Sequence, residues 1–168
     1  GARADGIGPL AGVRVVEATT TWAGPMCGCL FADLGADVIK LELPGGEVAR
    51  RLPPLLPGRQ QPLGFMHVTA NRGKRSLTLD LREPVGRGVA LDLLRSADVF
   101  VENFRPGTLA GWGLSYTDVC AVKPDVVYVS ISGWGQWGPA FDQAGYDPVA
   151  QAASGWLSLN GERDGAPV

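Results

Sequence analysis

The fold is decided by the stretch Val13-Arg-Val-Val-Glu-Ala-Thr-Thr-Thr-Trp-Ala-Gly-Pro-Met-Cys-Gly-Cys-Leu-Phe-Ala-Asp-Leu-Gly-Ala-Asp-Val-Ile-Lys-Leu-Glu-Leu43. Its two ends, residues 13–18 and 38–43, are short runs rich in Val, Ile and Leu and predict buried strands. Between them the apolar residues have helical spacing, at Met26, Leu30, Phe31 and Leu34. Pro25 suits the first position of that helix, and Gly35 suits the cap after it. A strand, a helix and a strand joined by short connections form the unit of a parallel sheet.

The same alternation continues along the chain. Strands are predicted over residues 76–81, 98–102 and 126–131. A helix is predicted over residues 84–96, and a short helix is predicted to begin at a capping box formed by Ser115–Asp118. A third helix is predicted to end at Ala153, with Asp147 as its N-cap and Pro148 at N1. The first of these helices is expected to bury Val85, Val89, Ala90, Leu93 and Leu94. Segment 43–66 is rich in Pro, Gly and Arg and has no periodicity, so we expect a long loop there.

These patterns predict an α/β fold with a Rossmann-like, largely parallel sheet and flanking helices. We expect one domain over residues 10–168, preceded by a flexible N-terminus over residues 1–9. The apolar content of 45% excludes disorder, and a net charge of −2 gives no strong field for nucleic acid or an anionic membrane. No apolar run reaches the roughly 20 residues that span a bilayer. We therefore expect no nucleic-acid and no membrane partner.

The thiols and the single histidine give no sign of a metal or disulfide framework. Cys27, Cys29 and Cys120 are too few and too irregularly spaced for either, and His67 is the one histidine of the chain. No carboxylate or nucleophile is predicted beside His67, so we do not expect it to be catalytic. The N-terminus lacks the apolar segment of a secretory signal. We expect no metal, reduced thiols and a cytoplasmic location.

Ligands of open parallel sheets bind at the carboxyl ends of the strands. Four segments follow predicted strands there: Thr19–Pro25, Pro44–Gly46, Asn103–Gly107 and Gly133–Pro139. The first leads into a helix N-terminus, which favours anionic groups. On topology alone, simple tight turns explain these segments equally well.

Two short motifs carry further information. Gly133-Trp-Gly-Gln-Trp-Gly138 matches the dinucleotide pattern G-x-G-x-x-G by letter, but Pro139 follows at once and no helix is predicted to open there, so we reject that interpretation. Asn71-Arg-Gly-Lys-Arg75 is a basic turn beside a predicted strand. It is either a solvated turn or a phosphate site in which lysine and arginine contact the anion.

Five segments in register resemble the class III CoA-transferase family of the CaiB/BaiF type, which includes formyl-CoA transferases and 2-methylacyl-CoA racemases. They are Ala23–Pro25 with Leu30–Glu42, Asn71–Leu81, Asp98–Gly107, Val129–Pro139, and Gly145–Asp147 with Gln151–Gly155. The resemblance covers the N-terminal part of the family's chain. It implies the N-terminal half of an interlocked-dimer fold and a homodimer at full length. The implied partners are coenzyme A or acyl-CoA and a carboxylic acid.

The resemblance also implies a mechanism. In this family an aspartate attacks the acyl-CoA thioester, the CoA thiolate returns to form an aspartyl-CoA thioester, and the acceptor acid then takes CoA. That aspartate lies a little beyond a segment that here is Gly161–Pro167, so we expect the nucleophile just beyond Val168 and no catalytic residue within the chain. The expectation is a CoA-binding domain that ends before the nucleophile and the second domain, and that is inactive alone. A non-catalytic CoA-binding module is an alternative.

Carried over residue by residue, the resemblance places the CoA site at Trp22, Ala23, Asn71, Lys74, Arg75, Asn103, Phe104 and Arg105. Leu43 and Gly111 stand where family members have arginine, which implies fewer phosphate contacts. Racemases carry a histidine where this chain has Tyr146, and a tyrosine with a pKa near ~10 is a poor base at neutral pH. A transferase is therefore favoured, with a racemase or CoA-dependent lyase as the other alternative.

Overall fold

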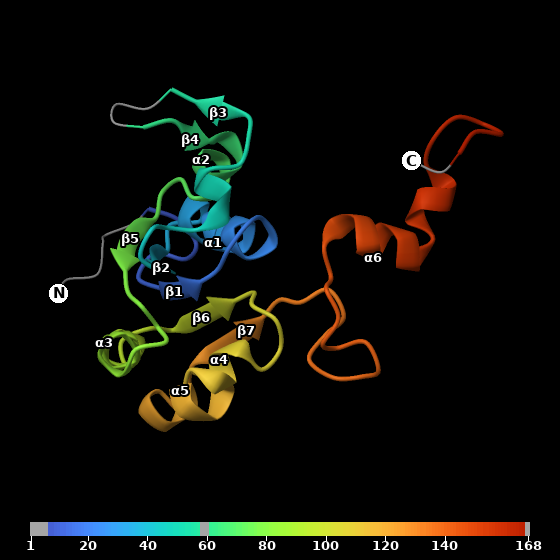
Figure 1. Ribbon diagram of the computed structural model, residues 1–168. Helices are drawn as coiled ribbons and strands as arrows, with labels where there is room; N and C mark the ends of the chain where they lie inside the picture. Colours follow the sequence, from blue (N-terminus) through green and yellow to red (C-terminus); the bar gives the residue numbers. More distant parts are fainter. Residues whose placement is uncertain (1–6, 58–60, 167–168) are drawn as a thin grey trace. The chain divides into compact units, whose positions relative to one another are not determined.

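The part of the chain up to Ile131 is built around a five-stranded sheet in the order β5-β2-β1-β6-β7 (Figure 1). The computed structural model describes residues 7–57 and 61–166, so the predicted flexible N-terminus lies largely outside the described residues. Every neighbouring pair in this sheet is parallel, which confirms the α/β class. The strands are β1 (Arg14–Ala18), β2 (Asp37–Glu42), β5 (Arg75–Thr78), β6 (Val99–Glu102) and β7 (Val127–Ser130).

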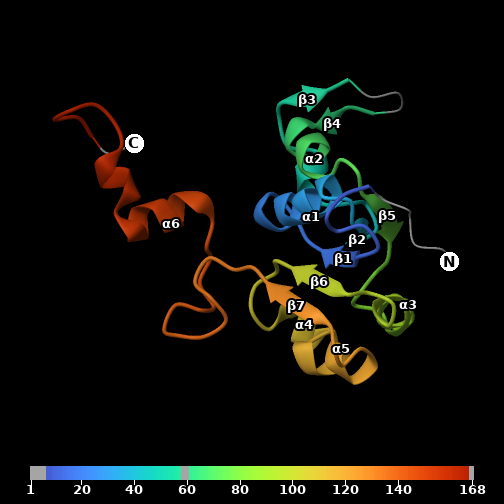
Figure 2. The ribbon, with the colours of Figure 1, turned by 180° about the vertical axis from the view of Figure 1, so that it is seen from behind.

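Alternate strand residues point into two separate cores, one on each face of the sheet. Val16 and Phe100 belong to the core that contains residues of α3, α4 and α5. Val15 and Val101 belong to the core that α1 covers, on the opposite face (Figures 1 and 2). The sheet is thus covered on both sides, as parallel sheets generally are. The helices are α1 (Ala23–Asp33), α3 (Pro84–Leu94), α4 (Thr108–Gly111) and α5 (Tyr116–Val122).

The strand register brings the candidate loops to one edge. Glu17 of β1 pairs with Lys40 of β2, and Ala18 pairs with Glu102 of β6. Glu102 in turn pairs with Ser130 of β7. The loops after β1, β2 and β6 therefore begin at the same carboxyl edge of the sheet.

Segment 43–66 is more structured than its sequence predicts. It contains the 3-10 helix η1 (Val48–Arg50), an antiparallel pair of strands, β3 (Leu55–Leu56) and β4 (Leu63–Gly64), and the start of α2 (Phe65–Ala70). Elements this short have no hydrophobic period, so the sequence pattern could not reveal them. In both views α2 lies beside α1 (Figures 1 and 2).

The buried face of α3 corrects one prediction. Val85 and Val89, expected in the core, are 80% and 43% exposed, whereas Ala90 and Leu94 are fully buried as predicted. Gly86 takes the place expected of a larger side chain, because its backbone lies directly against the Asp80 carbonyl.

Helix ends are partly as predicted. The capping box at Ser115 and Asp118 is confirmed, since each residue's side chain bonds to the other's backbone N–H. α1 begins at Ala23, two residues before the predicted start at Pro25. The short α4 was not predicted, because four residues are too few to show helical spacing.

Residues 132–168 are set apart as a second compact unit, and the single domain expected over residues 10–168 stays a prediction. The second unit contains α6 (Asp147–Ser154) and η2 (Trp156–Leu159). Tyr146 is the N-cap of α6, so Asp147 is its first helical residue rather than the predicted N-cap. No helix follows Gly138 directly, as the rejection of the dinucleotide motif requires. Within the described residues 132–166 no residue is buried. None of the helices in the described ranges is both long enough and apolar enough to cross a membrane.

Gly86→Ala is expected to lower the free energy of unfolding by about 2 kcal/mol, because overpacking a tight core costs on the order of 1–3 kcal/mol. A Cβ at Gly86 would lie 2.0 Å from the backbone oxygen of Asp80. Gly88→Ala is the matched control in the same helix, since a Cβ there meets no atom within 4 Å. It should stabilise by about 0.5–1 kcal/mol. Urea unfolding measures both, and equal effects would contradict this packing of α3.

Candidate functional site

One side chain joins the loop after β1 to the loop after β6. The Asn103 amide accepts a hydrogen bond from the backbone N–H of Thr20 (2.8 Å) and donates one to the Thr20 carbonyl (2.9 Å). Gly24 leaves the space that this contact needs, because a Cβ there would lie 2.7 Å from Thr19 and 2.8 Å from Asn103. Two of the loops singled out in the sequence therefore meet at the carboxyl edge.

Buried charges hold the threonines on either side of Thr20. The Lys40 ammonium donates to the Thr19 carbonyl (2.9 Å) and hydroxyl (3.3 Å). The backbone N–H of Thr21 donates to Oε2 of Glu47 at 2.7 Å. Each of three consecutive threonines is thus fixed by a side chain from a different part of the chain.

These charges belong to a buried cluster, defined here as Glu17, Lys40, Glu47 and Lys74. Lys40 Nζ lies 3.4 Å from Glu17 and 3.7 Å from Glu47, and all three side chains are at most 4% exposed. Lys74 Nζ lies 2.7 Å from Glu17 and is itself 2% exposed. Burial lowers the pKa of Lys74, and the adjacent Glu17 carboxylate opposes that shift. Charged residues inside strands of apolar residues were a sequence signal for Glu17 and Lys40, whereas Glu47 and Lys74 lie outside the strands.

Lys74 and Asn71, both predicted CoA contacts, point inside the domain. The Lys74 ammonium donates to the Pro25 carbonyl of α1 (2.7 Å) and to the Asn71 side-chain oxygen (3.1 Å), besides its contact with Glu17. Gly28 permits this close approach of α1, because a Cβ there would lie 1.6 Å from Glu17 Oε2. Lys74 therefore connects β1, the first turn of α1 and the end of α2.

His67 corrects another prediction, because a carboxylate does lie beside it. His67 is buried on α2, and its Nδ1 lies 2.9 Å from Oε1 of Glu47. The Asn71 amide donates to the His67 carbonyl (2.9 Å) and lies 3.3 Å from the same Glu47 oxygen. The partners are 20 residues apart in an aperiodic segment, so spacing could not have paired them.

Glu42, Glu47 and His67 offer ligand atoms within 4.8 Å of one another, and these residue types can bind metals. The carboxylates, however, already have protein cations: Arg50 donates to both Glu42 oxygens (2.8 and 2.5 Å), and Lys40 lies beside Glu47. Burial opposes ionisation of Glu42, but hydrogen bonds from Arg50 and from the Glu47 N–H outweigh it and lower the pKa of Glu42 to about 2. The expectation of no metal stays a prediction.

The other predicted CoA residues fall into two places. Trp22, Ala23 and Arg105 are exposed on the loops at the carboxyl edge. Phe104, next to Arg105, packs edge-on against Trp112 with ring centroids 5.2 Å apart. Arg75 lies elsewhere: its exposed side chain binds Asp37, the first residue of β2, at 3.1 Å. The structure links Lys74 and Asn71 to the first turn of α1 and Asn103 to the loop after β1, whereas Arg75 binds the amino end of β2.

Glu102 is a buried carboxylate that the sequence analysis missed. It ends β6 directly before Asn103 and accepts a hydrogen bond from the Phe104 N–H at 2.9 Å. Burial raises the pKa of Glu102, although hydrogen bonds from Ser130 and Phe104 oppose the shift. An acidic residue at the end of a strand of apolar residues was the signal that could have found it.

The start of α1 fits an anionic ligand. Its N-cap residue, Trp22, makes no side-chain capping bond, and the first turn contains no acidic residue. Uncapped N–H groups at a helix N-terminus attract phosphate groups. The exposed Trp22 ring and the exposed Arg105 side chain offer a stacking surface and a cation on the adjoining loops.

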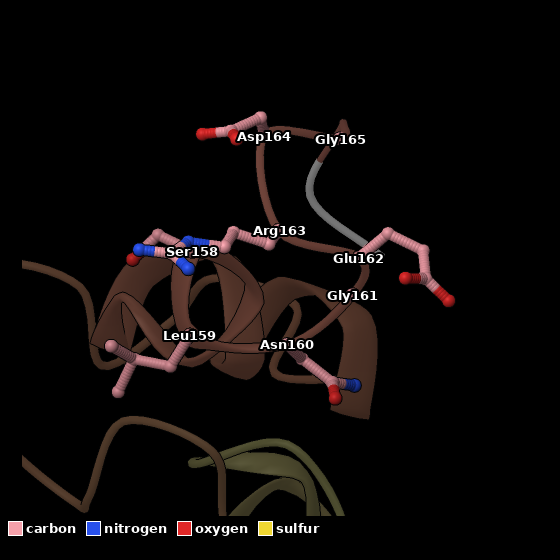
Figure 3. Close-up of a pocket in the computed structure, with 8 residues that line it drawn as sticks. All are labelled: Ser158, Leu159, Asn160, Gly161, Glu162, Arg163, Asp164 and Gly165. Atoms are coloured by element: carbon pink, nitrogen blue, oxygen red, sulfur yellow. The ribbon is translucent and has the colours of Figure 1, made fainter.

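The second unit has a separate hollow, lined by residues Ser158 to Gly165 (Figure 3). One continuous turn forms it, and its residues are exposed. It contains none of the predicted site residues and has no buried titratable group, so the carboxyl-edge site remains the candidate.

The fold is that of an α/β protein with a candidate site at the carboxyl edge of a parallel sheet, and comparison with known proteins specifies the family. The model of CoA-transferase family III matches residues 10–168, and the chain belongs to this family. The resemblance found in the sequence is thereby confirmed.

Relatives and solved structures agree. The chain is 45% identical over 95% of its length to succinate–glutarate CoA-transferase of Agrobacterium fabrum, and 40% identical over 96% to human succinyl-CoA:glutarate CoA-transferase. It spans 41% and 36% of those two proteins. A CaiB/BaiF family protein from Brucella suis superposes with a TM-score of 0.91 at 41% identity, over 96% of this chain and 43% of that one.

Lys74→Met is expected to lower the free energy of unfolding by about 3 kcal/mol, because removing one partner of a buried ion pair leaves an uncompensated charge. Glu17 is fully buried and would keep only Lys40, at 3.4 Å. Arg75→Ala, at the neighbouring exposed position, should cost less than about 1 kcal/mol. Chemical denaturation of both variants is the measurement, and a loss no larger for Lys74→Met than for Arg75→Ala would rule out the buried pair.

Acid should destabilise the chain partly through Glu42. Its pKa is lowered in the folded state to about 2, so its contribution is complete above the unfolded pKa of about 4.3 and is lost as pH falls toward 2. Between pH 6 and pH 3 we expect Glu42 to account for a loss of about 2 kcal/mol. Unfolding free energies measured at both pH values should fall less in Glu42→Gln than in wild type, and parallel pH profiles would contradict the assignment.

Proposed function

We propose that a protein of the relatives' length containing this chain transfers CoA from an acyl-CoA to a carboxylic acid. The supporting observation is the pair of interlocked loops at the carboxyl edge, next to the uncapped start of α1, within a segment that matches the family model. CoA carries phosphate groups and an adenine ring, which suit a helix N-terminus and an exposed aromatic side chain.

Seven of the eight predicted residues divide into two roles under this proposal, and Arg75, whose side chain binds Asp37 at the start of β2, is given neither. Trp22, Ala23, Phe104 and Arg105 contact CoA. The others support the site through the contacts described above: Asn71, Lys74 and Asn103. Asn103 fixes Thr20, and Lys74 fixes the first turn of α1.

The proposed reaction proceeds through an aspartyl intermediate, with the aspartate in the part of the protein beyond Val168. Its carboxylate attacks the thioester carbonyl and the C–S bond breaks. The CoA thiolate departs, and the acyl group and the aspartate are joined as a mixed anhydride. The thiolate then attacks the aspartyl carbonyl, which releases the donor acid. The acceptor carboxylate then attacks the aspartyl-CoA thioester, which releases the CoA thiolate and forms a second mixed anhydride. The thiolate attacks the acceptor's carbonyl in that anhydride, so that the acceptor leaves as its CoA thioester and the aspartate is restored. Backbone N–H groups would stabilise the oxyanions.

The substrates we propose are succinyl-CoA as donor and a short dicarboxylate as acceptor. The relatives' names support this class, because they pair succinyl-CoA with glutarate, L-malate or mesaconate. A homodimer and a cytoplasmic location also belong to the proposal and rest on the family resemblance.

Calorimetric titration of CoA into the 168-residue chain tests the site. Trp22→Ala should weaken binding about 10-fold, as expected for the loss of one stacked aromatic side chain worth about 1–3 kcal/mol. Tyr116→Ala is the control, because Tyr116 is an exposed aromatic residue on α5, which packs on the opposite face from α1. Equal affinities of the two variants would contradict the assignment of Trp22.

Activity is tested in a protein extended to the relatives' length. The expected result is transfer of CoA from succinyl-CoA to at least one dicarboxylate, and none with the 168-residue chain. Exchange of the α-proton of a 2-methylacyl-CoA, without any transfer, would overturn the proposal in favour of a racemase. Binding of CoA with neither reaction would indicate a non-catalytic module.

A further inference from the structure

Thr21 adopts a backbone conformation that its side chain disfavours. Its φ is +67°, in the left-handed region, and Asp164 is the only other non-glycine residue with positive φ within residues 7–57 and 61–166. Left-handed backbone is unfavourable for β-branched residues and persists only where surrounding contacts enforce it. Thr21 directly precedes Trp22, the N-cap of α1. Whatever enforces this conformation therefore also sets where the helix begins.

The strongest polar contact found for Thr21 is the hydrogen bond from its N–H to Glu47. The other polar contact found for Thr21, between its hydroxyl and that of Thr20, is long at 3.5 Å. The Glu47 bond is short at 2.7 Å, and its acceptor is an ionised carboxylate that is 4% exposed. Charge-assisted bonds of this kind are about twice as strong as neutral ones.

Glu47 is itself held on every side. Its N–H donates to Glu42 Oε1 at 3.2 Å, and its Oε1 is occupied by His67 at 2.9 Å. Lys40 supplies the nearest positive charge, at 3.7 Å. Hydrogen bonds from His67 and Thr21 and the charge of Lys40 lower the pKa of Glu47 against the effect of burial, so it is ionised at neutral pH. The other carboxylate oxygen of Glu47, Oε2, accepts the hydrogen bond from the Thr21 N–H in the loop after β1.

We propose that Glu47 is a positioning residue for CoA: it holds Thr21 in the left-handed conformation and so places Trp22 and the start of α1 for the ligand. This rests on the proposed function. Under this proposal segment 43–66 contributes to the site through Glu47, although none of the predicted CoA contacts comes from that segment.

The experiment is a double-mutant cycle between Glu47→Ala and Thr21→Gly, with CoA affinity as the readout on folded protein. Glycine adopts positive φ at no steric cost, so in Thr21→Gly the left-handed conformation no longer depends on the hydrogen bond to Glu47. We expect Glu47→Ala to weaken CoA binding about 10-fold in wild type but less than about 3-fold in the Thr21→Gly background. Glu47→Gln keeps an acceptor oxygen and should stay within about 3-fold of wild type.

Thr20→Gly is the matched control background, because Thr20 is the neighbouring residue and does not have positive φ. It should give no rescue of Glu47→Ala. An equal loss from Glu47→Ala in all three backgrounds would overturn the proposal and leave Glu47 as a structural ion-pair member only. If Glu47→Ala does not fold, Glu47→Asp replaces it, since the shorter side chain keeps the charge but withdraws the oxygen from Thr21.

Failure of the proposed function gives a different result. Wild-type protein that is folded but does not bind CoA would contradict the CoA site. The unfolding free energies of the same variants then decide the role of Glu47. Rescue of stability by Thr21→Gly, and not by Thr20→Gly, supports the enforced conformation, and its absence overturns it.

Discussion

The buried lysine between two carboxylates is the constraint on which the rest of the site depends. Lys40 lies on an interior strand with Glu17 on one side and Glu47 on the other, and the three side chains are at most 4% exposed. Taking each such charge out of water costs several kcal/mol, which is offset only if its remaining hydrogen-bonding groups are satisfied. The loop after β1 supplies part of that satisfaction: the Thr19 carbonyl accepts from Lys40, and the Thr21 N–H donates to Glu47, whereas Glu17 Oε2 is buried with no hydrogen-bond partner among the described residues. The loop conformation and the ionised core therefore stabilise each other.

This mutual dependence explains how a loop of small polar residues can hold a single conformation. Loops are usually the mobile part of a domain. Here the three threonines are held by β2, by the loop after β6 and by the start of η1, so the uncapped N-terminus of α1 is fixed relative to three other elements. Lys74 adds a fourth attachment, at the Pro25 carbonyl. A basic residue expected to bind phosphate thus holds the first turn of α1 instead.

The sequence predicted the sheet and its helices well because their signals are local. Val-rich runs, helical spacing and the Ser115 capping box each depend on residues close in the chain, and the structure confirms them. The buried cluster depends instead on partners far apart: Glu17 and Lys74 are 57 residues apart, and Thr21 and Glu47 are 26 apart. No periodicity encodes such pairs. The contacts made by His67 were missed for that reason, and the burial of Val85 was overestimated because Gly86, one residue on, takes the close contact with the neighbouring backbone.

Native-state amide hydrogen exchange of Thr20 and Thr21 tests the central claim most directly. If the loop is fixed to the buried cluster and to Asn103, both amides should exchange as slowly as the amides of β1, through global unfolding, because Thr20 donates to Asn103 and Thr21 donates to the buried Glu47. Exchange of either amide at the rate of an exposed loop, while β1 stays protected, would show that the loop opens independently. In that case the buried charges would not be what positions the site.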